Sequence, residues 1–239
     1  MRVFLLLLAF LSATAAAPAG KARTCRILFL AAPDDAPEKL HLFDGKASQE
    51  VELPRMNLSP VYQLPAGALE IRMLPAPSGD PKQVDARAPA ARIAEEISDC
   101  YLLVNPDPKN PVVPVAIQVI NASPDKLRRG QMLWFNLTSN KVGGQLGSRQ
   151  LAMEPNSRVI VDDPASGNEG YQVNLSFRIP GDERLFPLCE TKWTHDSSSR
   201  TIFFILTRAG SRTPRIMGFP DSRVEEKSDG ESAGKGPAT

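Results

Sequence analysis

In Tyr171-Gln172-Val173-Asn174-Leu175-Ser176-Phe177-Arg178-Ile179, apolar and polar side chains alternate without a break. Successive side chains of a β-strand point to opposite faces of the sheet, so the apolar set of this stretch faces a core and the polar set faces water. The stretch therefore predicts a strand with one buried face.

Other strand-like runs with turn residues between them flank this stretch on both sides. They lie at residues 113–120, 132–137, 150–153, 158–161, 188–195 and 201–206, with a glycine-rich turn expected at Gly143-Gly144. Seven such runs within about 100 residues are typical of an immunoglobulin-like β-sandwich, although the cysteine and tryptophan spacing of antibody domains is absent. We place this C-terminal module at residues 112–210.

The N-terminal half shows the same kind of pattern over shorter runs. They lie at residues 25–30, 40–43, 50–53, 61–64, 69–73 and 100–104. Asp44-Gly45 and Pro65-Ala66-Gly67 predict two hairpins, because Asp-Gly and glycine-containing turns between apolar runs favour tight reversals. We place an N-terminal β-sandwich module at residues 24–105.

Pro106, Pro108 and Pro111 cluster between these two regions. Proline disfavours regular strand pairing and stiffens a connection, so we place a proline-rich linker at residues 106–111. The predicted fold is thus all-β, with two small immunoglobulin-like β-sandwich modules packed in tandem. Residues 202–206 are apolar on both faces, so this strand is either central in its sheet or packs its second face on the N-terminal module. We favour the second arrangement.

The two ends of the chain differ from the rest. Met1-Arg2, a short apolar block and small residues predict a secretory signal peptide at residues 1–19, and the apolar block is too short to span a bilayer as a helix. Residues 220–239 are poor in apolar side chains, which predicts a disordered tail. We expect an exported protein, periplasmic or at the cell surface, without a membrane span in the mature chain.

Composition limits the partners that the chain can have. The net charge is +1 and no basic run exceeds Arg128-Arg129, so nucleic acid is not an expected partner. Three cysteines occur, Cys25, Cys100 and Cys189. We favour a disulfide between Cys25 and Cys100, with three buried free thiols as the alternative.

Few residues suggest chemistry. His195-Asp196 precedes three serines, but adjacent residues of a strand point to opposite faces, and this segment is more typical of a hairpin turn than of a catalytic triad. His41 is interpreted as an outward residue of a strand. The spacing of cysteines, histidines and acidic pairs predicts no metal site, and no motif predicts a cofactor or a catalytic residue.

Trp134 is the candidate binding residue. If Leu133, Phe135 and Leu137 face the core, then Trp134 is exposed, and an exposed tryptophan is a frequent binding anchor. The opposite phase of the strand would place Trp134 in a core or between the modules.

Residues 27–67, with Ala32-Pro33-Asp34-Asp35-Ala36-Pro37 followed by Leu40-His41-Leu42-Phe43-Asp44-Gly45, resemble exported bacterial β-sandwich proteins of uncharacterised function. The resemblance covers a fifth of the chain and implies a fold and a location, but no activity. We therefore expect a non-catalytic module that binds a protein or a glycan of the cell envelope, with the seam between the modules as the contact region. The alternatives are a structural component of an envelope assembly, and a hydrolase that uses His195.

Overall fold

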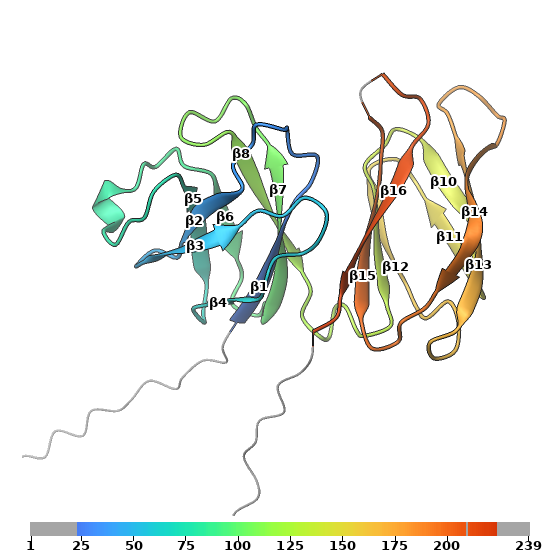
Figure 1. Cartoon of the computed structure of the whole chain (residues 1–239), viewed down its shortest axis with the longest axis horizontal. Coiled ribbons are helices and arrows are strands. Elements are labelled where there is room, and N and C mark those ends of the chain that lie inside the picture. The colour runs from blue at the N-terminus through green and yellow to red at the C-terminus, as the bar shows by residue number, and fades with distance from the viewer. Residues whose placement is uncertain (1–22, 209, 224–239) are drawn as a thin grey trace, which may run out of the picture.

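The computed structural model describes residues 23–208 and 210–223 (Figure 1). The described part of the chain is all-β, as predicted, and its strands form four sheets of four strands each. The one helical element in this part of the chain is a 3-10 turn at Pro81–Gln83 (η1). No helix in the same residues has both the length and the apolar character needed to cross a membrane. The predicted signal peptide lies outside the described residues.

The N-terminal half contains two of the sheets. Sheet A has the order β4-β1-β7-β8 and sheet B the order β3-β2-β5-β6. Their strands are β1 (Arg23–Phe29), β2 (Lys39–Phe43), β3 (Ser48–Glu52), β4 (Tyr62–Leu64), β5 (Leu69–Leu74), β6 (Ala90–Ile93), β7 (Asp99–Pro106) and β8 (Val115–Asn121).

The C-terminal half contains the other two sheets. Sheet C has the order β12-β9-β15-β16 and sheet D the order β11-β10-β13-β14. Their strands are β9 (Met132–Asn136), β10 (Lys141–Leu146), β11 (Arg149–Met153), β12 (Ser157–Val161), β13 (Gly170–Arg178), β14 (Phe186–Thr194), β15 (Arg200–Leu206) and β16 (Arg215–Asp221).

The two halves repeat one topology. Each strand of the N-terminal half corresponds to the strand eight places later in the C-terminal half, so that β1 corresponds to β9. With this correspondence, sheets A and C have the same strand order, and so do sheets B and D. The strand sense repeats as well, because β1 pairs in parallel with β7 and β9 pairs in parallel with β15. Each half is therefore one copy of the same eight-stranded arrangement.

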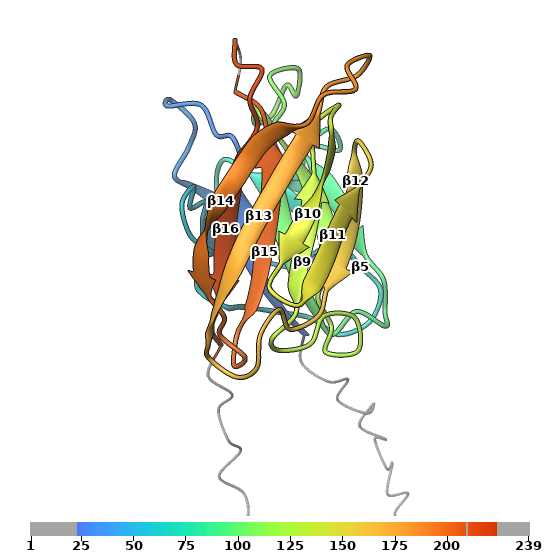
Figure 2. The ribbon, with the colours of Figure 1, turned by 90° about the vertical axis from the view of Figure 1, so that its right-hand side faces the viewer.

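Three apolar clusters fix the order of the layers. The first lies between sheets B and A, the second between sheets A and C, and the third between sheets C and D. The two halves consequently stand side by side with sheets A and C in contact, as Figure 1 shows, and sheet D forms the outer face of the C-terminal half in Figure 2. Burying both faces of sheets A and C removes a large apolar area from water, which is the main favourable contribution to folding.

The structure confirms both explanations for the apolar run at residues 202–206. β15 is a central strand of sheet C, between β9 and β16. Ile202, Phe204 and Leu206 face sheet A, and Phe203 and Ile205 face sheet D. A strand buried on both faces needs apolar side chains at every position.

The predicted linker at residues 106–111 is wrong. Pro106 is the last residue of β7 and pairs with Val115 of β8, so Pro108 and Pro111 lie in the loop of a hairpin within sheet A. The connection between the halves is the later segment 122–131, which contains a single proline, Pro124. Prolines are compatible with hairpin loops and strand ends, and their cluster therefore did not mark a domain boundary.

Other boundaries also need correction. The predicted second hairpin is wrong, since β4 pairs with β1 in sheet A while β5 pairs with β2 in sheet B. Gly143 and Gly144 are not a turn but lie inside β10, where a side chain at Gly144 would collide with the backbone oxygen of Asn174. The predicted tail begins too early, because Pro220 and Asp221 belong to β16; residues 224–239 lie outside the described part.

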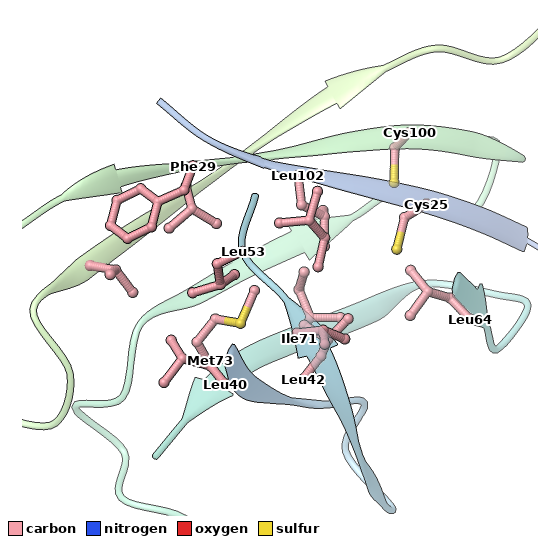
Figure 3. Close-up of a cluster of buried hydrophobic side chains, with 14 of the residues drawn as sticks. Cys25, Phe29, Leu40, Leu42, Leu53, Leu64, Ile71, Met73, Cys100 and Leu102 are labelled. Atoms are coloured by element: carbon pink, nitrogen blue, oxygen red, sulfur yellow. The ribbon is translucent and has the colours of Figure 1, made fainter. Parts of the chain in front are cut away.

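Cys25 and Cys100 are direct partners in the parallel pairing of β1 and β7 (Figure 3). Both are fully buried and both are free thiols, so the structure has the alternative arrangement and not the favoured disulfide. Cys189 is a free thiol as well and is half-buried. Burial raises the pKa of the Cys100 thiol to about 12 and raises the pKa of Cys25 further, which leaves little reactive thiolate at neutral pH.

We expect a thiol reagent at pH 8 to modify Cys189 first in the native protein and all three cysteines in denaturant without reductant. Burial shields Cys25 and Cys100 and disfavours their thiolates. Mass spectrometry of the labelled chain measures the sites. Labelling of Cys189 alone in denaturant, with Cys25 and Cys100 becoming reactive only after reduction, would show a disulfide instead.

Candidate functional site

The prediction for Trp134 is wrong. Its side chain is fully buried, and its ring lies 4.2 Å from that of Phe203 in the cluster between sheets C and D. Leu133 and Phe135 do share the opposite face, but sheet A covers that face. The predicted alternation of side chains along β9 is observed. However, sheets A and D cover the two faces of sheet C, so Trp134 has no water-facing side on which it could bind a ligand.

His195 follows β14 directly and is 4% exposed, so it is not an exposed turn residue. Its Nε2 atom lies 3.5 Å from Oδ1 of Asp163 but makes no hydrogen bond. Within the described part of the chain, no serine, threonine or cysteine side chain hydrogen-bonds to His195 either. A buried histidine beside a carboxylate can act as a general base, but His195 has no hydrogen bond to a nucleophile of the kind that a hydrolase needs. His41, in β2, is half-buried.

A large pocket lies at the seam between the halves, at the end where β7 and β15 begin. It is a cleft of about 1100 Å³, lined from the N-terminal half, from the connecting segment and from the C-terminal half. We call it the arginine cleft after its charged residues. These are Arg26, Arg128, Arg129, Arg200 and Arg223, with Asp99 and Asp221 between them.

Strand alternation explains why this end of the seam is polar. Arg26 precedes Leu28 by two residues on β1, and Asp99 and Tyr101 precede Leu103 on β7, so all of them face sheet C. Arg200 likewise begins the face of β15 that carries Ile202, Phe204 and Leu206. The interface is thus apolar along most of its length and charged at one end.

Asp221 is the centre of the charged end. Its carboxylate accepts hydrogen bonds from the Tyr101 hydroxyl at 2.5 Å, from Arg26 at 2.7 Å, from Arg200 at 2.8 Å and from Arg223 at 3.1 Å. Tyr101 and Arg26 belong to the N-terminal half, whereas Asp221 ends β16. The carboxylate therefore ties the two halves together.

Asp99 makes the reciprocal connection. Its carboxylate accepts from Arg200 at 2.8 Å and from Arg223 at 2.5 Å, and both arginines come from the C-terminal half. Arg200 also donates to the carbonyl oxygen of Ala122 at 2.6 Å. Charged groups that lie away from water are tolerated only when they are paired in this way.

The network perturbs the titration of its members. Burial by itself would raise the pKa of Asp221, but the hydrogen bond from Tyr101 and the charges of Arg223 and Arg200 outweigh it, and the pKa lies below its usual value. Burial raises the pKa of the Tyr101 phenol far above its usual value. Asp221 is accordingly ionised and Tyr101 neutral at physiological pH.

Arginines outnumber aspartates among the described residues that line the arginine cleft. Five arginines line it together with two aspartates. Arg128 lies 3.5 Å from Asp162, and Arg129 donates to the carbonyl oxygens of Ser198 and Arg223. The buried Nη2 atom of Arg223 has no hydrogen-bond partner within the described part of the chain. A cleft rich in arginine, with one buried donor unsatisfied, is suited to an anionic ligand.

The arginine cleft is not evident from the sequence. Arg26 and Asp221 are 195 positions apart, and Asp221 lies within the stretch predicted to be a disordered tail. The one available signal was Arg128-Arg129, the longest basic run of the chain, which does line the cleft. In the same described residues, no three side chains of histidine, cysteine, aspartate or glutamate are grouped as a metal site would require.

Comparison with known proteins adds no assignment, since no family model and no curated protein matches this chain. The function must be inferred from the geometry of the cleft.

Proposed function

We propose that this protein is an exported, non-catalytic binding module, composed of two immunoglobulin-like β-sandwiches in tandem, that holds an acidic segment of a cell-envelope protein in the arginine cleft. The start of the chain supports export to the periplasm or cell surface. The repeated strand order supports tandem sandwiches. The observation that carries the proposal is the excess of arginine in a cleft between two packed halves.

The cleft has the properties of a recognition site for carboxylates. Arginine offers a planar set of donors that matches a carboxylate in two parallel hydrogen bonds. The inner arginines are oriented by Asp99 and Asp221, so a ligand meets donors that are already in place, which reduces the entropy lost on binding. A volume of about 1100 Å³ is large enough for several residues of an extended peptide.

Replacing Arg128 and Arg129 together by glutamine is expected to weaken binding of an acidic peptide at least tenfold. The peptide to use is a fluorescein-labelled octapeptide of alternating glutamate and aspartate, measured by fluorescence anisotropy with the mature chain. The interaction is electrostatic, so the affinity of the unaltered protein should fall as sodium chloride is raised. Both arginines are exposed, and neither contributes a hydrogen bond to the carboxylates of Asp99 and Asp221, so the fold should persist although Arg129 donates to the carbonyl oxygens of Ser198 and Arg223.

The matched control is the double variant Arg87→Gln and Arg184→Gln, which removes the same charge from exposed pairs outside the cleft. It should bind like the unaltered protein. Equal weakening in both double variants, or equal binding of an octapeptide of glutamine and asparagine, would contradict the proposal. Binding of a sulfated polysaccharide in preference to the acidic peptide would contradict the choice of a protein ligand.

The hydrolase alternative has one observation in its favour, the buried position of His195 at 3.5 Å from Asp163. If this alternative holds, the protein hydrolyses a substrate and the His195→Ala variant does not. Turnover of a panel of ester and amide substrates by the unaltered chain, together with such a loss, would favour this alternative over a binding module.

A further inference from the structure

A second cavity lies beside the arginine cleft but opens within the C-terminal half. It has a volume of about 480 Å³ and lies where edge strand β14 of sheet D faces edge strand β16 of sheet C. Figure 2 shows these two strands one behind the other along one side of the half. We call it the aromatic groove, after Tyr171, Trp193, His195 and Phe203, which line it together with Gly218.

Its aromatic wall is built in layers. The Trp193 ring stacks on Phe203 with 5.2 Å between centroids and 6° between planes, and Phe203 stacks in turn on the buried Trp134. Tyr171 meets Trp193 edge-on at 6.4 Å. Trp193 is half-buried, whereas Trp134 beneath it is fully buried. Stacking thus fixes the orientation of a tryptophan that still lines an open cavity.

Gly218 makes this arrangement possible. It pairs with Phe203 across β15 and β16, and a Cβ atom added to it would lie 2.6 Å from the Phe203 ring. The ring occupies the space that a side chain at residue 218 would need. Phe203 can therefore cover the edge strand and support Trp193.

Polar groups surround the aromatic wall. Lys192, Thr194, Asp196 and Thr201 line the groove with His195. The Nε2 atom of His195 is itself buried and lies 3.5 Å from Oδ1 of Asp163, which does not line the groove, so this atom is not part of the surface that a ligand meets. Thr201 shares the face of β15 that carries Phe203 and is half-buried, and Asp196 is exposed, so these two residues bring a hydroxyl and a carboxylate to the groove.

We propose that the aromatic groove binds a sugar ring. The C–H face of a pyranose is apolar and slightly positive, so it packs on the negative face of an aromatic ring, while the ring hydroxyls both donate and accept hydrogen bonds. The groove offers both elements in one place: the Trp193 wall, and the hydroxyl of Thr201 with the carboxylate of Asp196. The site uses none of the five arginines of the cleft, so it is independent of the acidic-peptide proposal.

The experiment is a titration of the mature chain with a panel of neutral and amino sugars, followed by the indole N–H resonances in a ¹H–¹⁵N correlation spectrum. The chain has two tryptophans and hence two such resonances. We expect at least one sugar to shift the Trp193 resonance saturably and more strongly than that of Trp134. No saturable shift with any sugar, or shifts only at resonances outside the groove, would overturn the proposal.

Variants test the same site. Trp193→Ala is expected to weaken binding of that sugar about tenfold or more, and Thr201→Val, which removes the hydroxyl but keeps the shape of the side chain, is expected to weaken it as well. Phe186→Ala is the control, because this half-buried aromatic lies on the same strand as Trp193 but stacks on Phe177 outside the groove. Unchanged binding in Thr201→Val, or equal weakening in Phe186→Ala, would contradict the site even if Trp193→Ala does not fold.

Discussion

The Asp221→Ala variant is expected to lose about 3–5 kcal/mol of unfolding free energy, as buried ion pairs do when one partner is removed. The Asp221 side chain is fully buried, and its carboxylate accepts hydrogen bonds from Tyr101 and three arginines. Removing the carboxylate takes one hydrogen-bonding and ionic partner from each of those arginines at the seam. Urea denaturation followed by circular dichroism measures the change.

Asp85→Ala is the matched control, since it removes an aspartate that pairs with Arg87 at 2.7 Å on the surface. Its effect should be much smaller, because exposed ion pairs contribute little to stability. If the two variants were destabilised equally, Asp221 would not be the connection between the halves that the structure indicates.

The Asp221 carboxylate should also make stability depend on acid pH. Its pKa in the folded protein is below the usual value, so its contribution is complete above the unfolded pKa of about 4 and is lost as pH falls through the folded pKa. The unaltered protein should therefore be more stable than Asp221→Asn at about pH 5, and this difference in unfolding free energy should shrink as the pH is lowered to about 2. A constant difference over that range would contradict this assignment.

Phe204→Ala is expected to lower the unfolding free energy by about 3–5 kcal/mol, the range for truncating a buried phenylalanine. Phe204 is fully buried between sheets A and C, with its ring 5.2 Å from Phe135 and 5.9 Å from Phe219. The cluster is shared by both halves, so the loss should also speed hydrogen exchange in β1 and β7 of the N-terminal half. Denaturation and hydrogen–deuterium exchange test the two effects.

Leu185→Ala serves as the control for Phe204→Ala, because Leu185 is 65% exposed and its truncation should change stability by less than about 0.5 kcal/mol. Two separate unfolding transitions in the unaltered protein, with the N-terminal half insensitive to Phe204→Ala, would mean that the halves fold independently.

Local patterns were sufficient to predict most strands. The alternation in residues 171–179 corresponds to β13, and Asp44-Gly45 does join β2 to β3. The sequence does not predict β16, because Gly218 and Pro220 weaken its strand pattern, and it predicts a turn at Gly143-Gly144, because glycine is common in turns. In both cases the glycine is needed for a close approach to a neighbouring strand, which a single sequence does not reveal.

The site was less predictable than the fold. Trp134 does lie on the opposite face of its strand from Leu133 and Phe135, but a single sequence does not reveal that sheet D covers the face that carries Trp134. The arginine cleft combines residues of β1, β7, β15 and β16 with the connecting segment, and each of them alone is compatible with an ordinary surface charge. Only the packing of sheet A on sheet C brings these charges together.

The most direct test of the acidic-ligand proposal is a hydrogen–deuterium exchange footprint of the chain from Gly20 to Thr239 with and without the acidic octapeptide. We predict slower exchange at residues 124–129, 198–200 and 221–223, which contribute to the arginine cleft, and unchanged exchange in sheet B on the far side of the N-terminal half. Protection elsewhere on the molecule, or no protection at peptide concentrations that saturate binding, would contradict a ligand site at the seam between the two halves.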